Sequence, residues 1–373
     1  MNNQLTFTLT LEPLTLDEQS YFEDDLTHLG LDATVWEILN NTLATSTAYT
    51  VPKLLRAYAA NQLVGVALVL HCRQGMKAFF AEPLATIVDP VGIPQFVWNR
   101  SAVMVDQYSN PGFVVAGFDR NVFVEKALHY LQRRYLFGVL LCDKNSPPAG
   151  TFVRSSLMDY GIIRLDSAMV LDEVFARHKN LKRKLNKFRN KGGSVKTFRG
   201  ALPKNLLEPI LHCLRQAEVH SMGKTPFQDN YVNMSLQSFH SSNQNVVHFV
   251  AYLNDNIVGY HSFALSGQQL CCLSGGFDRT QTTTFHAYEN LIVESIAFAL
   301  EQNLSVINYG SIINDTKAKM MQDYVPTEVR FYSPLAPVRW LFPTIINNSF
   351  WSPALLEPYT NLATKVVSTS GEN

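Results

Sequence analysis

The sequence lacks the features that mark several large classes of protein. In its 373 residues, no apolar run approaches the roughly 18–20 residues that a membrane-spanning helix needs. The opening stretch, MNNQLTFTLTLEPLTL, has neither the basic start nor the continuous apolar segment of a secretory signal. The five cysteines form no CxxC pair and no metal-ligand spacing. We therefore expect a cytoplasmic protein with reduced cysteines, no metal site and no transmembrane segment.

Motifs for nucleotide, zinc and hydrolase chemistry are missing as well. The sequence contains no GxxxxGK[ST] phosphate loop, no HExxH zinc motif and no GxSxG nucleophile turn. It contains no zinc finger either, so sequence-specific DNA binding is not expected. These absences exclude the protein classes that are defined by those motifs.

Basic residues are missing from the first 50 positions, although the whole chain balances 31 Lys and Arg against 31 Asp and Glu. Those 50 residues hold eight acidic side chains, at positions 12, 17, 18, 23, 24, 25, 32 and 37. Eight cations and no acid are concentrated in RHKNLKRKLNKFRNK (177–191). Two interpretations stay open: the acidic segment pairs with this basic segment within the molecule, or the basic segment binds an anionic partner.

The chain is long and apolar enough for two domains. Its hydrophobic content is 46% and its aromatic content 11%, which supports packed cores. The Pro- and Gly-containing stretch DKNSPPAG (143–150) interrupts the chain between two halves. We expect an N-terminal unit over residues 1–150 and a C-terminal unit over residues 151–373.

Two short matches between the halves indicate an internal repeat. AYAANQLVG (57–65) matches AYLNDNIVG (251–259) at an offset of 259 − 65 = 194 residues, with a hairpin turn expected in the middle of each. AGFDR (116–120) matches GGFDR (275–279) at an offset of 276 − 117 = 159 residues. The first half therefore carries 194 − 159 = 35 additional residues, which we place within residues 82–112. The same order of matches predicts a duplication.

The second half has a clear order of elements. Strands are expected at 248–253, 257–265 and 270–277, followed by a helix at 286–302 and a strand at 306–310. Asn303 suits the end of that helix. The order gives a three-stranded meander, a crossover helix and a strand parallel to the third. We therefore predict an α/β fold of two units, each a mixed sheet covered by helices.

This order of elements resembles the core of the GCN5-related N-acyltransferases, the GNAT fold. Two such units with a basic helix at 172–191 resemble the Fem-like acyltransferases of peptidoglycan biosynthesis. The similar segments are RHKNLKRKLNKFRNKGGSVKTFRG (177–200), HSMGKTPF (220–227) and NYGSIINDTKAKM (308–320). The resemblance covers residues 171–332 and is weaker in the first half. It implies an active second unit and a degenerate or structural first unit.

The resemblance implies transfer of an acyl group to an amine of a peptide, an amino acid or a cell-envelope precursor. Many GNAT proteins hold the coenzyme A pyrophosphate with a glycine-containing loop after the fourth strand. Here that place reads DRTQTTTFHA (278–287), without glycine. The donor is an acyl-CoA or an acyl carrier protein, or else an aminoacyl-tRNA as in Fem-type enzymes, and no tightly bound cofactor is expected. A fold that has kept a binding role and lost the chemistry is a further alternative, and no oligomeric state is predicted.

The basic helix has one apolar face. Val174, Leu181, Leu185 and Phe188 are spaced for burial along it. Its cationic side chains Lys182, Arg183 and Lys187 are the candidates for contact with an anion, including tRNA phosphates.

Four residues are predicted to carry chemistry. The resemblance implies that the reaction takes place where the fourth and fifth strands diverge. Asp278 at the end of the fourth strand is the candidate base, with a role at a helix entry or in a turn as its structural alternative. Tyr309 is the candidate acid for the leaving group, with core packing as its alternative. Lys317 and His220 are placed in loops that lie near the substrate in the relatives.

Four further residues are predicted to contact the donor: Gly275, Gly276, Arg279 and His286. The two glycines would open a β-bulge that exposes backbone donors, or would only allow close packing. Glu289 and Tyr288 at the helix start are interpreted as surface or capping residues, and His261 as a core histidine. The aromatic, proline-rich tail after residue 337 is expected to pack on the second unit, or to form an apolar lip or a dimer contact.

Overall fold

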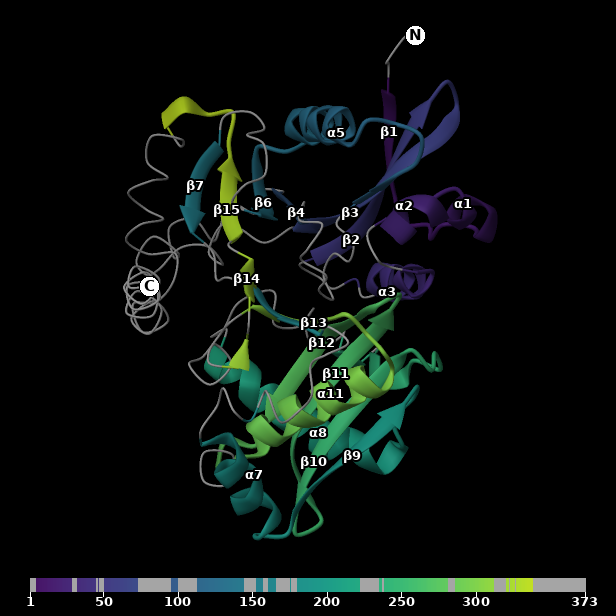
Figure 1. Cartoon of the computed structure of the whole chain (residues 1–373). Coiled ribbons are helices and arrows are strands. Elements are labelled where there is room, and N and C mark those ends of the chain that lie inside the picture. The colour runs from purple at the N-terminus through teal and green to yellow at the C-terminus, as the bar shows by residue number, and fades with distance from the viewer. Residues whose placement is uncertain are drawn as a thin grey trace, which may run out of the picture.

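The computed structural model describes two β-sheets flanked by helices (Figure 1). The described residues are 5–28, 32–44, 46, 50–72, 95–99, 113–143, 152–156, 160–165, 175, 180–221, 235–236, 238–280, 286–311, 320–321, 323–325 and 327–337. Within these ranges, no helix is long and apolar enough to cross a bilayer.

The first sheet has eight strands in the order β1-β2-β3-β4-β6-β15-β7, and β5 also pairs with β3. The β4–β6 pair is parallel, and the other pairs are antiparallel. The strands are β1 (Leu5–Thr10), β2 (Thr50–Ala59), β3 (Gln62–Cys72), β4 (Gln95–Asn99), β5 (Phe113–Val115), β6 (Phe137–Asp143), β7 (Phe152–Ser156) and β15 (Thr327–Tyr332).

The second sheet has seven strands in the order β14-β8-β13-β12-β11-β10-β9. Its strands are β8 (Tyr160–Arg164), β9 (Gly193–Arg199), β10 (Val246–Leu253), β11 (Asn256–Ser266), β12 (Gln269–Phe277), β13 (Val306–Ser311) and β14 (Asp323–Val325). β10, β11 and β12 form the predicted meander, and β13 is parallel to β12. The predicted mixed α/β class is confirmed.

Helices cover both sheets (Figure 1). They are α1 (Leu16–Ser20), α2 (Glu23–His28), α3 (Thr34–Leu43), α5 (Arg120–Arg134), α7 (Leu181–Arg189), α8 (Lys204–Ser221) and α11 (Ala287–Glu301). In the second unit, α7 and α11 share one apolar core with one face of the sheet, whereas α8 packs on the opposite face. α11 confirms the helix predicted at 286–302, and Asn303 follows it with a left-handed φ of 54°.

The first sequence match reflects one hairpin geometry used twice. The turn residues Ala60 and Asn61 have φ of 49° and 67°, and Asn254 and Asp255 have φ of 48° and 66°. Two consecutive left-handed residues are typical of the tight turn that matches strand twist. Each hairpin also has a register shift directly after the Ala of its Ala-Tyr pair. The predicted duplication is therefore visible in the β2–β3 and β10–β11 hairpins.

The second sequence match is displaced in the structure. Ala116 N–H donates to Val64 O at 2.9 Å, and Asp278 N–H donates to Val258 O at 3.0 Å. Val64 and Val258 are equivalent at the offset of 194, so Ala116 and Asp278 occupy the same place on the sheet. Asp119, which matches Asp278 in sequence, lies three residues farther and caps α5. GGFDR thus lies largely in β12, whereas AGFDR follows β5, so the two similar segments occupy different registers.

The additional residues of the first unit have a structural counterpart. β12 is continuous, whereas the equivalent pairing to β3 is divided between β4 and β5. The residues between these two strands (100–112) and those between β3 and β4 (73–94) lie outside the described part of the chain.

The two sheets exchange strands. β7 follows residue 150 and belongs to the first sheet, while β15 is inserted between β6 and β7 from the far end of the chain. β8 and β14 extend the second sheet beside β13. The boundary at residue 150 stays a prediction, since the chain passes from the first sheet to the second between β7 and β8 and returns between β14 and β15.

The acidic N-terminal segment holds the units together and does not pair with α7 through its described contacts. Asp32 accepts from Gly267 N–H at 2.9 Å and from Ser266 Oγ at 3.1 Å. Glu37 accepts from Ser241 Oγ at 2.6 Å and also from Asn243 Nδ2. α3 lies between the sheets, whereas α7 lies at the far end of the second unit (Figure 1).

The remaining acidic contacts of this segment stay within the first unit. Glu18 pairs with Arg56, and Asp25 pairs with Arg120 at 2.7 Å. These four carboxylates therefore have partners other than the basic helix, and the intramolecular alternative is wrong for them.

Candidate active site of the second unit

β12 and β13 separate toward their carboxyl ends. Parallel pairing joins 269–271 to 306–308 and stops there, although β12 continues to Phe277. Beyond Asn308, β13 is irregular and pairs with β8 up to Ser311. The divergence of the fourth and fifth strands, which the sequence predicts as the place of reaction, is therefore present.

A β-bulge lies in β12, but the predicted glycines do not form it. Ser262 faces Ser274 and Phe263 faces Cys272, so Leu273 is the additional residue. A Cβ at Gly276 would lie 2.7 Å from the backbone carbonyl carbon of Cys213 in α8. A Cβ at Gly275 would lie 2.6 Å from the His261 ring. The bulge prediction for Gly275 and Gly276 is wrong, and close packing explains both.

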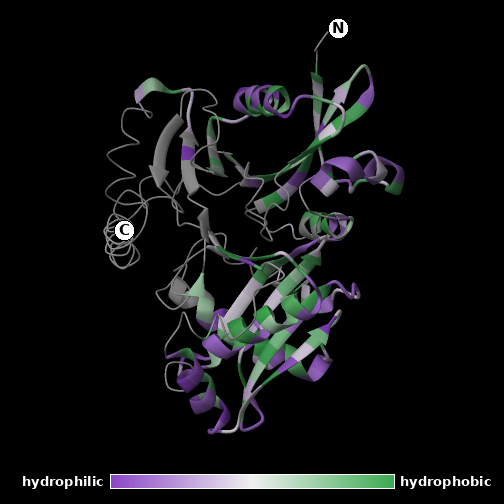
Figure 2. Ribbon diagram, in the orientation of Figure 1, coloured by the Kyte–Doolittle hydropathy of each residue, from purple (hydrophilic) through white to green (hydrophobic). Residues whose placement is uncertain are grey.

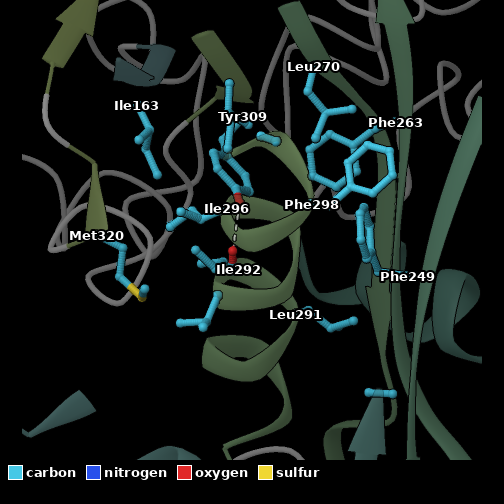
Figure 3. Packing of buried hydrophobic residues seen from close by; sticks show 14 of the residues in the cluster. Ile163, Phe249, Phe263, Leu270, Leu291, Ile292, Ile296, Phe298, Tyr309 and Met320 are labelled. Atoms are coloured by element: carbon cyan, nitrogen blue, oxygen red, sulfur yellow. Dashed lines mark hydrogen bonds between the residues drawn. The ribbon is translucent and has the colours of Figure 1, made fainter. Parts of the chain in front are cut away.

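Tyr309 lies in the core of the second unit. Its side chain points from β13 toward α11, and its hydroxyl donates to Ile292 O at 3.2 Å (Figure 3). The hydroxyl also hydrogen-bonds Ser295 Oγ. The residue is 1% exposed, and this burial raises the pKa of Tyr309 above its usual value. The acid role predicted for Tyr309 has no support in this placement, because the hydroxyl already fastens β13 to α11.

Asp278 lies on the other face of the sheet, beside α8. Its Oδ1 accepts from Thr280 N–H at 3.0 Å and Thr280 Oγ1 at 2.6 Å. Arg279 N–H donates to Gln216 Oε1 of α8 at 3.1 Å. Burial and the neighbouring Asp278 charge raise the pKa of the Cys213 thiol to about 12. The structure thus gives Asp278 the turn-capping contacts that were its structural alternative.

The predicted site residues do not form one group. Tyr309 and Gly275 face α11, while Asp278 and Gly276 face α8. Among the residues that the structure describes, no group of three or more His, Cys, Asp or Glu could hold a metal ion. Lys317 lies outside the described residues. His220 belongs to the last turn of α8, so its predicted loop position is wrong, and its side chain is not described.

A charged group at the start of α11 was missed by sequence reasoning. Glu289 is 5% exposed, and Lys184 Nζ of α7 donates to its Oε1 at 2.7 Å. His286 Nδ1 lies 3.4 Å from the same oxygen. The spacing of His286 and Glu289 was visible as i, i+3, but the partner from α7 is 105 residues away in sequence. Glu289 was therefore interpreted as a surface or capping residue, and its burial shows that the surface position is wrong.

Aromatic rings line the sheet next to this group. The His261 ring is buried and lies edge-on to Phe277 and Tyr288, with centroids 5.4 Å away in each case. Phe277 and Tyr288 also contact each other at 5.0 Å and are half-buried. They join the end of β12 to the first turn of α11. His261 is therefore packed as a core histidine, which is the interpretation that the sequence favoured.

The outer face of α7 carries exposed cationic side chains, and the helix is largely hydrophilic in Figure 2. Lys182, Arg183 and Lys187 are exposed, and none forms an ion pair with a described residue. Leu181, Leu185 and Phe188 are buried, which confirms the predicted apolar face; Val174 lies outside the described residues.

The comparisons with known proteins rest on structure. No family model matches the sequence, and no curated protein matches it. A carboxy-terminal domain named for lysylphosphatidylglycerol synthetase from Agrobacterium fabrum has a TM-score of 0.54 at 9% identity, over 89% of this chain and 97% of that one. L-PGS from Bacillus licheniformis has a TM-score of 0.51 at 12% identity, over 90% and 98%. FemX has a TM-score of 0.52 at 11% identity, over 90% and 99%.

These similarities extend over nearly the whole chain. At such low identity they show the fold alone. The architecture resembles that of these structures, and its two mixed sheets covered by helices agree with the fold that the sequence resemblance implies.

Proposed function

We propose that the second unit is an acyltransferase that takes its acyl group from an aminoacyl-tRNA and transfers it to an amine. The observation that carries the choice of donor is the buried Glu289 carboxylate in the first turn of α11. In the coenzyme A-dependent GNAT proteins, the start of this helix receives the pyrophosphate. Here a side-chain anion already lies there, and Lys184 already pairs with it at 2.7 Å.

Physical chemistry disfavours a pyrophosphate beside this carboxylate. A helix N-terminus favours one anion through its free N–H groups and its dipole. A second anion at the same place would meet Glu289 at short range, where burial weakens screening by water and salt. The glycine-free sequence before α11 points in the same direction, because side chains keep the backbone farther from a phosphate.

The cationic outer face of α7 supports a polyanionic donor. Lys182, Arg183 and Lys187 are exposed on the element that also supplies Lys184 to the start of α11. A tRNA bound along this face would be held mainly through its phosphates. Two of the similar structures are FemX and a domain named for lysylphosphatidylglycerol synthetase, and the Fem-like group is the one that the sequence resembles.

The chemistry requires little beyond placement and proton transfer. The acceptor amine must be neutral, the tetrahedral oxyanion needs a donor, and the departing ribose hydroxyl needs a proton. We place this reaction where β12 and β13 diverge. The acceptor is an amine of a peptide, an amino acid or a cell-envelope precursor.

Binding of tRNA at different salt concentrations tests the donor. Reversing three charges, with Lys182→Glu, Arg183→Glu and Lys187→Glu together, is expected to weaken tRNA binding about 100-fold or more. The slope of log affinity against log salt should fall by about 2–3, because each phosphate contact contributes nearly one. The matched control is Lys126→Glu, Arg133→Glu and Arg134→Glu on α5, which changes the charge equally on exposed residues of the first unit.

The outcomes separate the candidate functions. Equal loss in both triple variants would mean that only net charge matters, and this would contradict the proposed tRNA surface. Tight, specific binding of an acyl-CoA or an acyl carrier protein, with no effect of the α7 variant, would support the thioester donor. No transfer from any of these donors would support a binding module that has lost the chemistry.

A further inference from the structure

His286 has a backbone conformation that its counterpart in the first unit does not share. As the N-cap of α11 it has φ of 59° and ψ of 33°, in the left-handed region, and its side chain makes no capping hydrogen bond. Asp119, the N-cap of α5, is extended at φ of −69° and caps Val122 N–H in the ordinary way. A non-glycine residue in this region costs free energy, and such residues are concentrated at functional sites.

The His286 side chain faces a buried carboxylate. Nδ1 lies 3.4 Å from Glu289 Oε1, and the two side chains are 22% and 7% exposed. Lys184 Nζ contacts the same oxygen at 2.7 Å and compensates the carboxylate charge. A carboxylate beside Nδ1 favours the tautomer that carries its hydrogen there. Nε2 is then left as the proton acceptor on a partly exposed ring, as in the carboxylate–imidazole pairs of acyl-transfer enzymes.

The surroundings fix this pair at the reacting end of the sheet. Asn290, which is buried, donates from Nδ2 to His286 O at 2.9 Å and holds the left-handed residue in place. Tyr288, which lies between His286 and Glu289 in the sequence, packs on Phe277 at the end of β12. The start of a crossover helix lies at the carboxyl ends of the parallel strands that it joins, where α/β proteins bind ligands.

We propose that His286 is the general base of the transfer, with Glu289 as the residue that orients its ring and Lys184 as the counter-ion. This inference rests on the proposed function. Nε2 removes a proton from the attacking amine nitrogen as the new C–N bond to the carbonyl carbon forms. When the C–O bond to the ribose breaks, the imidazolium returns that proton to the departing oxygen. The products are an amide and a free hydroxyl, so atoms and charge balance.

Removal of the ring with chemical rescue tests the role of His286. In His286→Gly the left-handed backbone is retained without strain, because glycine adopts positive φ readily. Single-turnover transfer from charged tRNA should fall about 100-fold to 10,000-fold, the usual contribution of a general base. Added imidazole should restore part of the rate, and tRNA affinity should stay unchanged. His286→Asn is the control: asparagine tolerates the same backbone, but its side chain is no base and fills the space, so imidazole should not restore activity.

Different outcomes distinguish this inference from the proposed function. A wild-type protein that transfers from charged tRNA, together with a His286→Gly variant that is equally fast, would overturn the base and leave the function standing. A slow His286→Gly variant that imidazole fails to restore would also overturn it, in favour of a structural residue. A wild-type protein that transfers from no charged tRNA would overturn the proposed function and this inference with it.

The orienting residue has its own test. The double variant Lys184→Met and Glu289→Gln removes both charges together, so neither side chain is left as an unpaired buried ion. We expect kcat to fall about 10-fold to 100-fold with KM and tRNA affinity unchanged. An unchanged kcat would contradict the orienting role of Glu289.

Discussion

In each unit an ion pair holds the start of the crossover helix, but the helix contributes a cation in the first unit and an anion in the second. In the first unit, Arg120 at the start of α5 pairs with Asp25 of α2 at 2.7 Å. In the second, Glu289 at the start of α11 pairs with Lys184 of α7, also at 2.7 Å. The first arrangement leaves an ordinary capped helix, whereas the second holds a left-handed His286 beside a buried carboxylate. The starts of the two crossover helices therefore differ in backbone conformation and in the sign of the charge that the helix contributes.

The two units also differ in the parallel pairing of their fourth and fifth strands. β4 and β6 form five consecutive parallel pairs, from Gln95↔Phe137 to Asn99↔Leu141. β12 and β13 form three and then diverge. In both units the strand segment that leads into the crossover helix, β5 in the first and the end of β12 in the second, does not pair with the fifth strand. The units therefore differ here only in the length of the parallel pairing.

The buried pair of His248 and Ser262 gives the largest expected difference in stability between the units. His248 Nδ1 lies 2.7 Å from Ser262 Oγ, where the first unit pairs Leu54 with Leu68 at the offset of 194. Burial lowers the pKa of His248 from 6.5 to about 4. As the pH falls, the unfolded chain therefore binds this proton before the folded chain does. The free energy of unfolding keeps its full value above pH 6.5 and decreases as the pH falls to about 4.

The expected loss is roughly 3 kcal/mol of unfolding free energy, at 1.36 kcal/mol for each unit of pKa difference. Urea unfolding between pH 7 and pH 4 would measure it. The double variant His248→Leu and Ser262→Leu, which copies the first unit, should remove that part of the pH dependence. An unchanged pH dependence in this variant would contradict the assignment to His248.

Breaking the two helix-start ion pairs compares them directly. Lys184→Met leaves Glu289 buried without its cation and should cost about 2–3 kcal/mol, less than a fully buried pair because Lys184 is one-third exposed. Arg120→Met should cost less, since Asp25 is more exposed and keeps a hydrogen bond from Val115 N–H at 3.0 Å. Equal losses in urea unfolding would show that the burial of the two acids makes no difference.

Replacing the glycines of the two GFDR segments by alanine should change the unfolding free energy by different amounts. Gly276→Ala places a Cβ 2.7 Å from the α8 backbone, which cannot rotate away, and should cost about 1–3 kcal/mol. Gly117→Ala has open space around the new Cβ but a φ of 62°, so about 1 kcal/mol is expected. A reversed order would contradict the packing role of Gly276.

The smallest effect is expected at the buried hydroxyl of the second core. Tyr309→Phe removes the hydrogen bond to Ile292 O and should lower the unfolding free energy by about 1 kcal/mol. Tyr332→Phe in β15 is the comparison in the first sheet, where a long 3.4 Å contact to Gln132 O should contribute less. Transfer activity of folded Tyr309→Phe should be measured too, because a 100-fold loss would restore the acid role that the sequence suggested.

Local patterns predicted much of this fold. The hairpin turns at Asn61 and Asp255 and the bounds of α11 followed from short-range signals, since turn residues and helical periodicity are set within a few positions. The insertion of β15 between β6 and β7 could not be predicted, because its pairing joins strands about 190 residues apart. No local pattern encodes such a partner.

The candidate site was harder to predict for the same reason. His286 was identified for its position, but the role given to it there was donor contact. The sequence suggested a surface or capping role for Glu289, but this residue is buried and pairs with Lys184 of another helix. Tyr309 and Asp278 occupy the predicted strand ends and face opposite sides of the sheet. Strand positions follow from sequence, whereas the functional value of a side chain depends on which helix covers it.

The central claim is that the second unit uses an aminoacyl-tRNA and not a coenzyme A thioester. The most direct measurement incubates the purified full chain with a pool of aminoacylated tRNAs carrying labelled amino acids, and separately with a panel of acyl-CoAs. Each mixture also contains candidate amines, and formation of labelled amide is followed. The account predicts amide from at least one charged tRNA and none from the acyl-CoAs, with the α7 triple variant inactive. Amide formation from an acyl-CoA, undiminished by that variant, would contradict it.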